Sequence, residues 1–268
     1  MRVISFINGS LISESASLYA LHYAKEMKLK IDFIHIESQD NLSEVQTSLK
    51  KLTLLADSYE VENEFLLFDS FDGAKEYLTS KELDVIFCAT RHNHSFFEKS
   101  FAQTLLKANI KTDLAIVKIV KLSMHESVDK IVMPIRGSKL SVKKFFFFTA
   151  FTLAYNAKAE IYSLDKSSKG EMANLSTQQE RERFQEILFN LKHYFALAKM
   201  MHLKFSLKHN FALLADEKVT AHIAKNNYDL TIIGGHHDKS FFGHHPIDIL
   251  FKTPITNTLF FIPYKDQS

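Results

Sequence analysis

Cysteine, tryptophan, proline and glycine are all scarce in this sequence. Its 268 residues contain one cysteine, no tryptophan, four prolines and seven glycines. The lone cysteine, Cys88, excludes a disulfide framework and a zinc site built from cysteines, and it fits a protein of the reducing cytosol. Because glycine is so rare, we expect each one to occupy a position whose backbone requires it.

An excess of one charge and long apolar runs are missing as well. The 33 basic and 31 acidic residues leave a formal net charge of +2, which excludes a basic field over the whole chain of the kind that binds nucleic acid. The longest apolar stretch, Phe145 to Tyr155, is too short to span a bilayer and contains two threonines. The first ten residues lack the apolar core and cleavage site of a signal peptide. We therefore expect a cytoplasmic protein that engages neither nucleic acid nor a membrane.

The sequence contains two copies of one pattern. Residues 2–10 and 130–138 are both apolar runs that end in Gly-Ser, at an offset of 128 residues. Farther along the chain the offset is 145: Asp84 corresponds to Asp229, and a Ser-Phe-Phe triplet follows each of them. The offset grows by 17 residues, which places an insertion in the polar stretch 166–179 of the second copy. The chain is therefore predicted to be a tandem duplication.

Within each copy, short apolar runs alternate with longer segments whose apolar residues recur at helical spacing. This alternation predicts right-handed βαβ units and a parallel sheet with helices on both sides. The predicted fold class is thus α/β, with two tandem domains, 1–122 and 128–265, each a five-stranded, mainly parallel sheet flanked by helices. The expected strands cover 3–7, 31–36, 64–68, 85–88 and 114–119, then 131–135, 159–164, 204–211, 230–233 and 259–262; the expected helices include 13–28, 42–59, 73–81, 140–156, 178–201 and 216–225.

Five of the seven glycines follow predicted strands, where ligands of open α/β sheets bind. Turn geometry alone explains Gly9 and Gly137, because a β-to-α turn needs a flexible residue. For Gly234, Gly235 and Gly243 two explanations stay open: turn geometry, or a cradle in which main-chain N–H groups bind phosphate oxygens. The Gly-Lys-Ser/Thr sequence of a Walker loop is absent.

With its first strand ending in a polar turn and a glycine-bearing loop after the fourth strand, the repeated unit resembles the universal stress protein domain, an α/β fold similar to adenine-nucleotide-binding proteins. The resemblance covers nearly the whole chain. The family's aspartate after the first strand, which contacts adenosine, falls on Asn8 in one copy and on Arg136 in the other. The family's Gly-Ser/Thr pair falls on Gly243-His244, and fewer residues separate Gly234 from this pair than in the family pattern.

This resemblance implies a stress-response protein that senses or binds a ligand, with ATP or AMP as the ligand and the second copy as its only site. In the first copy Ala89 replaces the first loop glycine, and the carboxylate of Glu98 would repel a triphosphate. No catalytic residue is expected. The expected nucleotide-binding residues are Arg136, Ser138, Gly234, Gly235, Gly243, His244 and His245.

Three alternatives stay open. The departures from the family pattern favour a partner-binding or structural protein that has lost nucleotide binding. A slow nucleotide hydrolase has the least support, since no carboxylate pair for Mg²⁺ and no obvious base stand out. The histidines at 236, 237, 244 and 245, together with Asp238, are candidate metal ligands, but a solvated polar loop is the preferred explanation and no metal site is assigned.

The two copies are expected to pack as an intramolecular pseudo-dimer by pairing their last strands, as single-domain family members do between subunits. Whether the chain also forms a homodimer stays open. Four consecutive phenylalanines, 145–148, cannot all face one core, so some are expected to contact the other copy or another subunit. Ser10 and Ser138 are expected to cap helices rather than act as nucleophiles, and the charged run 180–183 is interpreted as solvated surface.

Overall fold

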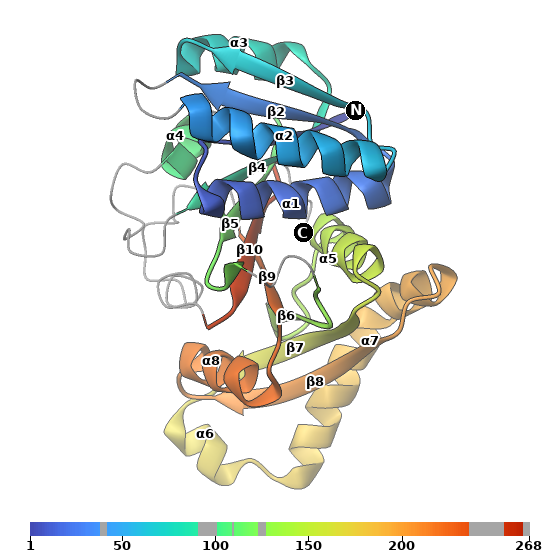
Figure 1. The fold of residues 1–268 in the computed structure, drawn as a ribbon. Coiled ribbons are helices and arrows are strands. Elements are labelled where there is room, and N and C mark those ends of the chain that lie inside the picture. Colours follow the sequence, from blue (N-terminus) through green and yellow to red (C-terminus); the bar gives the residue numbers. More distant parts are fainter. Residues whose placement is uncertain (38–41, 91–100, 109, 123–126, 236–254, 265–268) are drawn as a thin grey trace.

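A computed structural model describes residues 1–37, 42–90, 101–108, 110–122, 127–235 and 255–264 (Figure 1). Within these residues ten strands form one sheet in the order β3-β2-β1-β4-β5-β10-β9-β6-β7-β8. The strands are β1 (Arg2–Phe6), β2 (Lys30–Ile36), β3 (Asn63–Phe68), β4 (Leu83–Thr90), β5 (Asp113–Lys118), β6 (Lys130–Arg136), β7 (Lys158–Lys166), β8 (Phe205–Ala212), β9 (Leu230–Gly234) and β10 (Asn257–Ile262).

The two copies build matching halves of this sheet. The first copy orders its strands β3-β2-β1-β4-β5, and the second repeats that order as β8-β7-β6-β9-β10. The halves join where β5 and β10 run antiparallel, with Lys118 opposite Thr258 and Leu114 opposite Ile262. The predicted α/β class and the predicted pairing of the last strands are both confirmed. The domain limits 1–122 and 128–265 stay a prediction, because one continuous sheet does not define where a domain ends.

Helices cover both faces of the sheet, as right-handed crossovers between parallel strands require. Core residues of α1, α2, α5 and α7 pack on one face, and those of α3, α4 and α8 pack on the other. In the described ranges, no helix has the length and apolar character that a membrane span requires. The helices are α1 (Leu11–Met27), α2 (Leu42–Ser58), α3 (Phe71–Ser80), α4 (Phe101–Lys107), α5 (Val142–Ala154), α6 (Lys169–Asn174), α7 (Thr177–Met200) and α8 (Ala215–Asn226).

The insertion of the second copy forms helical structure outside the sheet. The polar stretch 166–179 contains α6 and the start of α7, and capping boxes at Ser168 and Ser176 fix where these helices begin. In Figure 1, α6 and the adjacent end of α7 project beyond the sheet at the bottom of the view. The prediction of α7 from residue 178 is confirmed, whereas α6 was not expected.

The phenylalanine run of α5 connects the two halves. Phe145, Phe147 and Phe148 are at most 2% exposed, whereas Phe146 is 41% exposed. The ring of Phe147 stacks on Phe261 of β10 at 4.1 Å and lies 5.4 Å from Tyr23 of α1. The expectation that part of this run contacts the other copy is confirmed.

Candidate functional site

The candidate site lies at the carboxyl edge of the second half, where β6 and β9 end. Arg136 is the last residue of β6 and is exposed, and the next residue, Gly137, is buried. Gly137 has φ +50°, a conformation that L side chains rarely adopt. The sequence predicted that turn geometry explains this glycine, and the positive φ is the physical reason.

Neighbouring residues of β7 hold the Gly137 turn in place. The Gly137 N–H donates to the Leu164 carbonyl at 2.9 Å, and the Ser163 hydroxyl donates to the Gly137 carbonyl at 2.7 Å. A Cβ added at Gly137 would lie 2.9 Å from Asp165 Oδ1, so the carboxylate packs directly against the turn. The turn therefore requires glycine for two reasons, its backbone conformation and this close approach.

An ion pair lies over the same turn. Arg183 of α7 donates from Nε to Asp165 Oδ2 at 2.6 Å, and its Nη1 donates to Glu186 at 2.5 Å. These carboxylate partners, Asp165 first, raise the pKa of the guanidinium above its ordinary value. Arg183, which was interpreted with the run 180–183 as solvated surface, has a side chain that is 37% exposed and also contacts the β6 turn, because the insertion brings this helix against that turn.

The two serines that were expected to cap helices behave differently. Ser10 caps α1 and accepts from the Ser13 N–H, which confirms the prediction. Ser138 does not cap α5; that position belongs to Ser141, which accepts from the Lys144 N–H. Residues 136–139 form a tight turn before the helix begins, so Ser138 lies ahead of the capping position. Its hydroxyl instead accepts from Asn190 of α7 at 3.2 Å.

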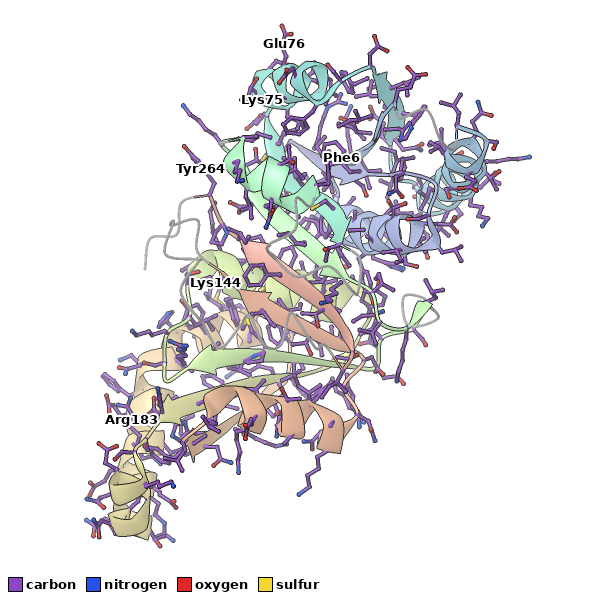
Figure 2. The ribbon with its side chains drawn as sticks, turned by 90° about the vertical axis from the view of Figure 1, so that its left-hand side faces the viewer. Phe6, Lys75, Glu76, Lys144, Arg183 and Tyr264 are labelled. Carbon is purple, nitrogen blue, oxygen red and sulfur yellow. The ribbon has the colours of Figure 1, made fainter. Side chains whose placement is uncertain are left out.

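At the end of β9, Gly234 and Gly235 allow side chains to pack against the backbone. A Cβ at Gly234 would lie 2.6 Å from Cδ of Lys144, and a Cβ at Gly235 would lie 2.7 Å from Cζ of Phe260. The Gly235 N–H donates to the Phe261 carbonyl at 2.8 Å. Lys144 lies beside this end of the strand pair in Figure 2. Close packing is thus a sufficient reason for both glycines, and Lys144 is a cation at this site that the sequence reasoning missed.

Three predicted binding residues, Gly243, His244 and His245, lie outside the described residues. The same holds for the remaining members of the histidine cluster, His236, His237 and Asp238. In the part of the chain that is described, no group of three or more His, Cys, Asp or Glu residues could hold a metal ion.

The β1 turn of the first half is closely packed. Gly9 has φ +79°, and a Cβ there would lie 2.8 Å from both Glu44 Cβ and the Val45 nitrogen at the start of α2. Asn8 turns its side-chain oxygen toward the local backbone and accepts from the Ser10 N–H. The first turn of α2 therefore occupies the space beside the β1 turn and places a glutamate there.

Two buried polar clusters near the opposite edge occupy equivalent places in the halves. The Asp32 carboxylate, 1% exposed, accepts from Arg2 and Tyr77, both at 2.8 Å. The Glu160 carboxylate, 7% exposed, contacts His222 Nε2 at 2.5 Å. These pairs are related by the repeat offsets, 128 residues for the carboxylates and 145 for their helical partners. The offsets could have revealed them, but the residue types differ between copies, so identity matching misses them.

No family model and no curated protein sequence matches this chain. A universal stress protein from Archaeoglobus fulgidus is similar in structure, with a TM-score of 0.60 and 11% identity over 97% of each chain. The chain has the universal stress protein fold. A protein of unknown function from Pseudomonas aeruginosa PAO1 is similar with a TM-score of 0.59 and 12% identity, over 98% of this chain and 92% of that one.

One domain of a transporter is also similar in structure to this chain. The cytoplasmic domain of a prokaryotic cation chloride cotransporter has a TM-score of 0.58 and 8% identity, over 98% of this chain and 95% of that one. At these identities the likeness concerns the fold, and function has to be argued from the site.

Proposed function

We propose that this protein is a cytoplasmic stress-response protein that binds an adenine nucleotide, ATP or AMP, at the carboxyl edge of its second half only. The observation that carries the proposal is the packing of Lys144 against Gly234. This contact holds the aliphatic part of the lysine at the end of β9, where ligands of open α/β sheets bind. Its ammonium group adds a positive charge at this edge, which favours an anionic ligand such as a phosphate.

The distribution of charge supports a single site. In the second half, Arg136 is exposed at the end of β6 and Lys144 packs at the end of β9, whereas Arg183 is already paired with Asp165 and Glu186. In the first half, the position that corresponds to Lys144 is Ala16, and Glu44 lies beside the β1 turn. An anionic ligand is attracted to the first arrangement and repelled by the second.

Native mass spectrometry of the purified protein and equilibrium titration with ATP and AMP test this proposal. One molecule of nucleotide per chain is the expected result. Lys144→Met should weaken binding about ten- to a hundredfold, the range expected for a lost charge-assisted hydrogen bond. Lys75→Met, on α3 of the other half, is the matched control and should leave the affinity unchanged. Equal weak signals from all three proteins would refute nucleotide binding.

A partner-binding protein without nucleotide is the second candidate. It is favoured by the Gly235 N–H, which already donates to Phe261, and by the side chains that pack closely against Gly234 and Gly235. The similar cytoplasmic domain of a cotransporter shows this fold in a protein that is named for transport. Absence of nucleotide in both experiments would favour this second function. Metal analysis of the untagged protein tests the remaining alternative, a metal site in the histidine loop.

A further inference from the structure

His209 of β8 lies beneath the Gly137 turn. Its side chain is 5% exposed, its Nδ1 is 3.0 Å from Ser163 Oγ, and its ring packs edge-on against Phe211 at 4.8 Å. Ser163 is the same residue that donates to the Gly137 carbonyl. A chain of contacts therefore runs from the imidazole through one hydroxyl to the turn of the candidate site.

The hydrogens along this chain can be assigned. A serine hydroxyl has one hydrogen to donate, and that of Ser163 is directed to the Gly137 carbonyl at 2.7 Å. Ser163 Oγ therefore accepts from His209, which requires the hydrogen of the neutral imidazole to be on Nδ1. The other nitrogen, Nε2, then has a lone pair and no hydrogen.

Nε2 is buried, and in the described part of the chain no hydrogen-bond partner reaches it. The nearest charged atom is Asp165 Oδ2 at 3.9 Å, and that carboxylate is engaged by Arg183. Once Nε2 is protonated, the imidazolium is attracted to the Asp165 carboxylate.

Charged groups from two elements act on the ring. Burial has the largest effect and lowers the pKa of His209 below its ordinary value; Arg183 of α7 acts in the same direction. Asp165 of β7, the Ser163 bond and Glu180 of α7 oppose it. A groove of about 460 Å³ beside the ring is also lined by Arg181, Lys208 and His222, and it gives water a path toward the imidazole.

We propose that His209 is a positioning residue that couples the proton concentration to the ligand turn of the second half. The neutral ring holds Ser163 and, through it, the Gly137 carbonyl. The imidazolium donates from Nε2 to Asp165 and competes with Arg183 for that carboxylate. Arg183 Nε, which donates to Asp165 at 2.6 Å, is then released. The guanidinium, whose Nη2 is 3.5 Å from the position of a Cβ at Gly137, can then turn toward an anion at the turn. This regulation rests on the proposed nucleotide site, whereas the positioning role does not.

Long-range ¹H–¹⁵N NMR of the histidine side chains tests the assignment without any nucleotide. His209→Asn identifies the His209 signals by difference, and its amide nitrogen can still donate to Ser163 while it cannot titrate. The expected result is the Nδ1–H tautomer at pH 7.5 and protonation below pH 6.5, the ordinary midpoint. An Nε2–H tautomer, or a ring that is already protonated at neutral pH, would overturn the proposal. Ser163→Ala should change the tautomer ratio, and an unchanged ratio would also overturn it.

Amide hydrogen exchange at Gly137 tests whether the ring holds the turn. After correction for intrinsic rates, protection of this amide should fall between pH 7.5 and a pH below the His209 midpoint that the NMR titration gives, and it should stay constant in His209→Asn. Equal pH dependence in both proteins would show that the ring does not control the turn. Circular dichroism at both pH values confirms that each protein stays folded.

The affinity for ATP and AMP at the two pH values tests the regulation. The wild-type affinity divided by that of His209→Asn should rise about fivefold or more at the lower pH, below the measured His209 midpoint, which is the lower end of ordinary coupling between sites. Taking this ratio removes the titration of the nucleotide itself. A constant ratio would refute the regulation. Absence of binding at both pH values would refute the proposed function, and the NMR and exchange results would then decide the positioning role alone.

Discussion

Substitution of Phe147 by alanine should destabilise the whole molecule, because this ring connects the two halves of the sheet. It is 2% exposed, stacks on Phe261 of β10 with an interplanar angle of 15°, and contacts Tyr23 of α1. Its ring centre is also 6.2 Å from that of Phe87 on β4. Two of these partners belong to the first half and one to the second.

The expected loss is about 3–5 kcal/mol, the ordinary cost of removing a buried phenylalanine side chain. The stacked contact with Phe261 places the value toward the upper end, since an aromatic pair adds about 0.5–1.5 kcal/mol beyond area burial. For a protein with a total stability of about 5–15 kcal/mol, such a loss is a large fraction. The neighbouring Phe146, of identical chemistry on the same helix, is 41% exposed and should cost less than about 1 kcal/mol.

Urea denaturation, followed by circular dichroism and by tyrosine fluorescence, measures both variants. Phe147→Ala should lower the midpoint strongly and Phe146→Ala only slightly, with the two probes coinciding if the halves unfold together. Equal losses for the two variants would show that α5 does not pack in this orientation. A loss confined to one of two separate transitions would show that the phenylalanine run does not couple the halves.

Three further substitutions or probes follow from single contacts. Gly137→Ala should lower the free energy of unfolding by about 1–2 kcal/mol because of the positive φ, and by more if Asp165 cannot move. Gly170→Ala in α6 is the control, because no atom lies within 4 Å of the added Cβ, and it should be neutral or slightly stabilising. Thermal unfolding compares the two variants. Burial alone would raise the pKa of Glu160, but hydrogen bonds from Lys208, Tyr228 and His222 outweigh it and lower the pKa below the ordinary 4.5. The ionised carboxylate therefore stabilises the fold above pH 4.5. This stabilisation is lost as the pH falls through the lowered pKa. Glu160→Gln should therefore cost about 3 kcal/mol at pH 7 and flatten the acid limb of the stability curve, and an unchanged acid limb would contradict the assignment. Burial raises the pKa of Cys88 to about 12, so a thiol reagent at pH 8 should react only after urea unfolds the protein, and rapid reaction of the native protein would contradict its buried position.

Much of the fold could be predicted because the apolar periodicity and its repetition along the chain depend on residue order alone. The strand runs at 3–7 and 131–135 differ from β1 and β6 by one residue at most at either end, and the helix expected from residue 42 is present as α2. The alternation of strands and helices predicts parallel crossovers but not the order of the strands. The exception is α6, because its polar insertion contains no apolar periodicity and only its capping serines indicate a helix.

The site was predicted less well, because its parts come from segments with unrelated sequence patterns. Gly137 and Gly234 were recognised as special, and both do lie at strand ends. Lys144, Asp165 and Arg183 were missed as parts of the site, since a lysine, an aspartate and an arginine in amphipathic or polar segments are typical of solvated surface.

The sequence by itself determined the α/β class, the repeated apolar pattern, the strand-end glycines and the near-neutral charge, since each of these depends on residue order or composition alone. Tertiary structure decided which cations lie near those glycines and which side chains pack against each strand-end turn. The first half places the start of α2 against its β1 turn, whereas the second half places the Asp165–Arg183 pair and Lys144 against its two turns. These differences arise from close contacts between residues far apart in the chain, which depend on how α2, α5 and α7 pack on the sheet.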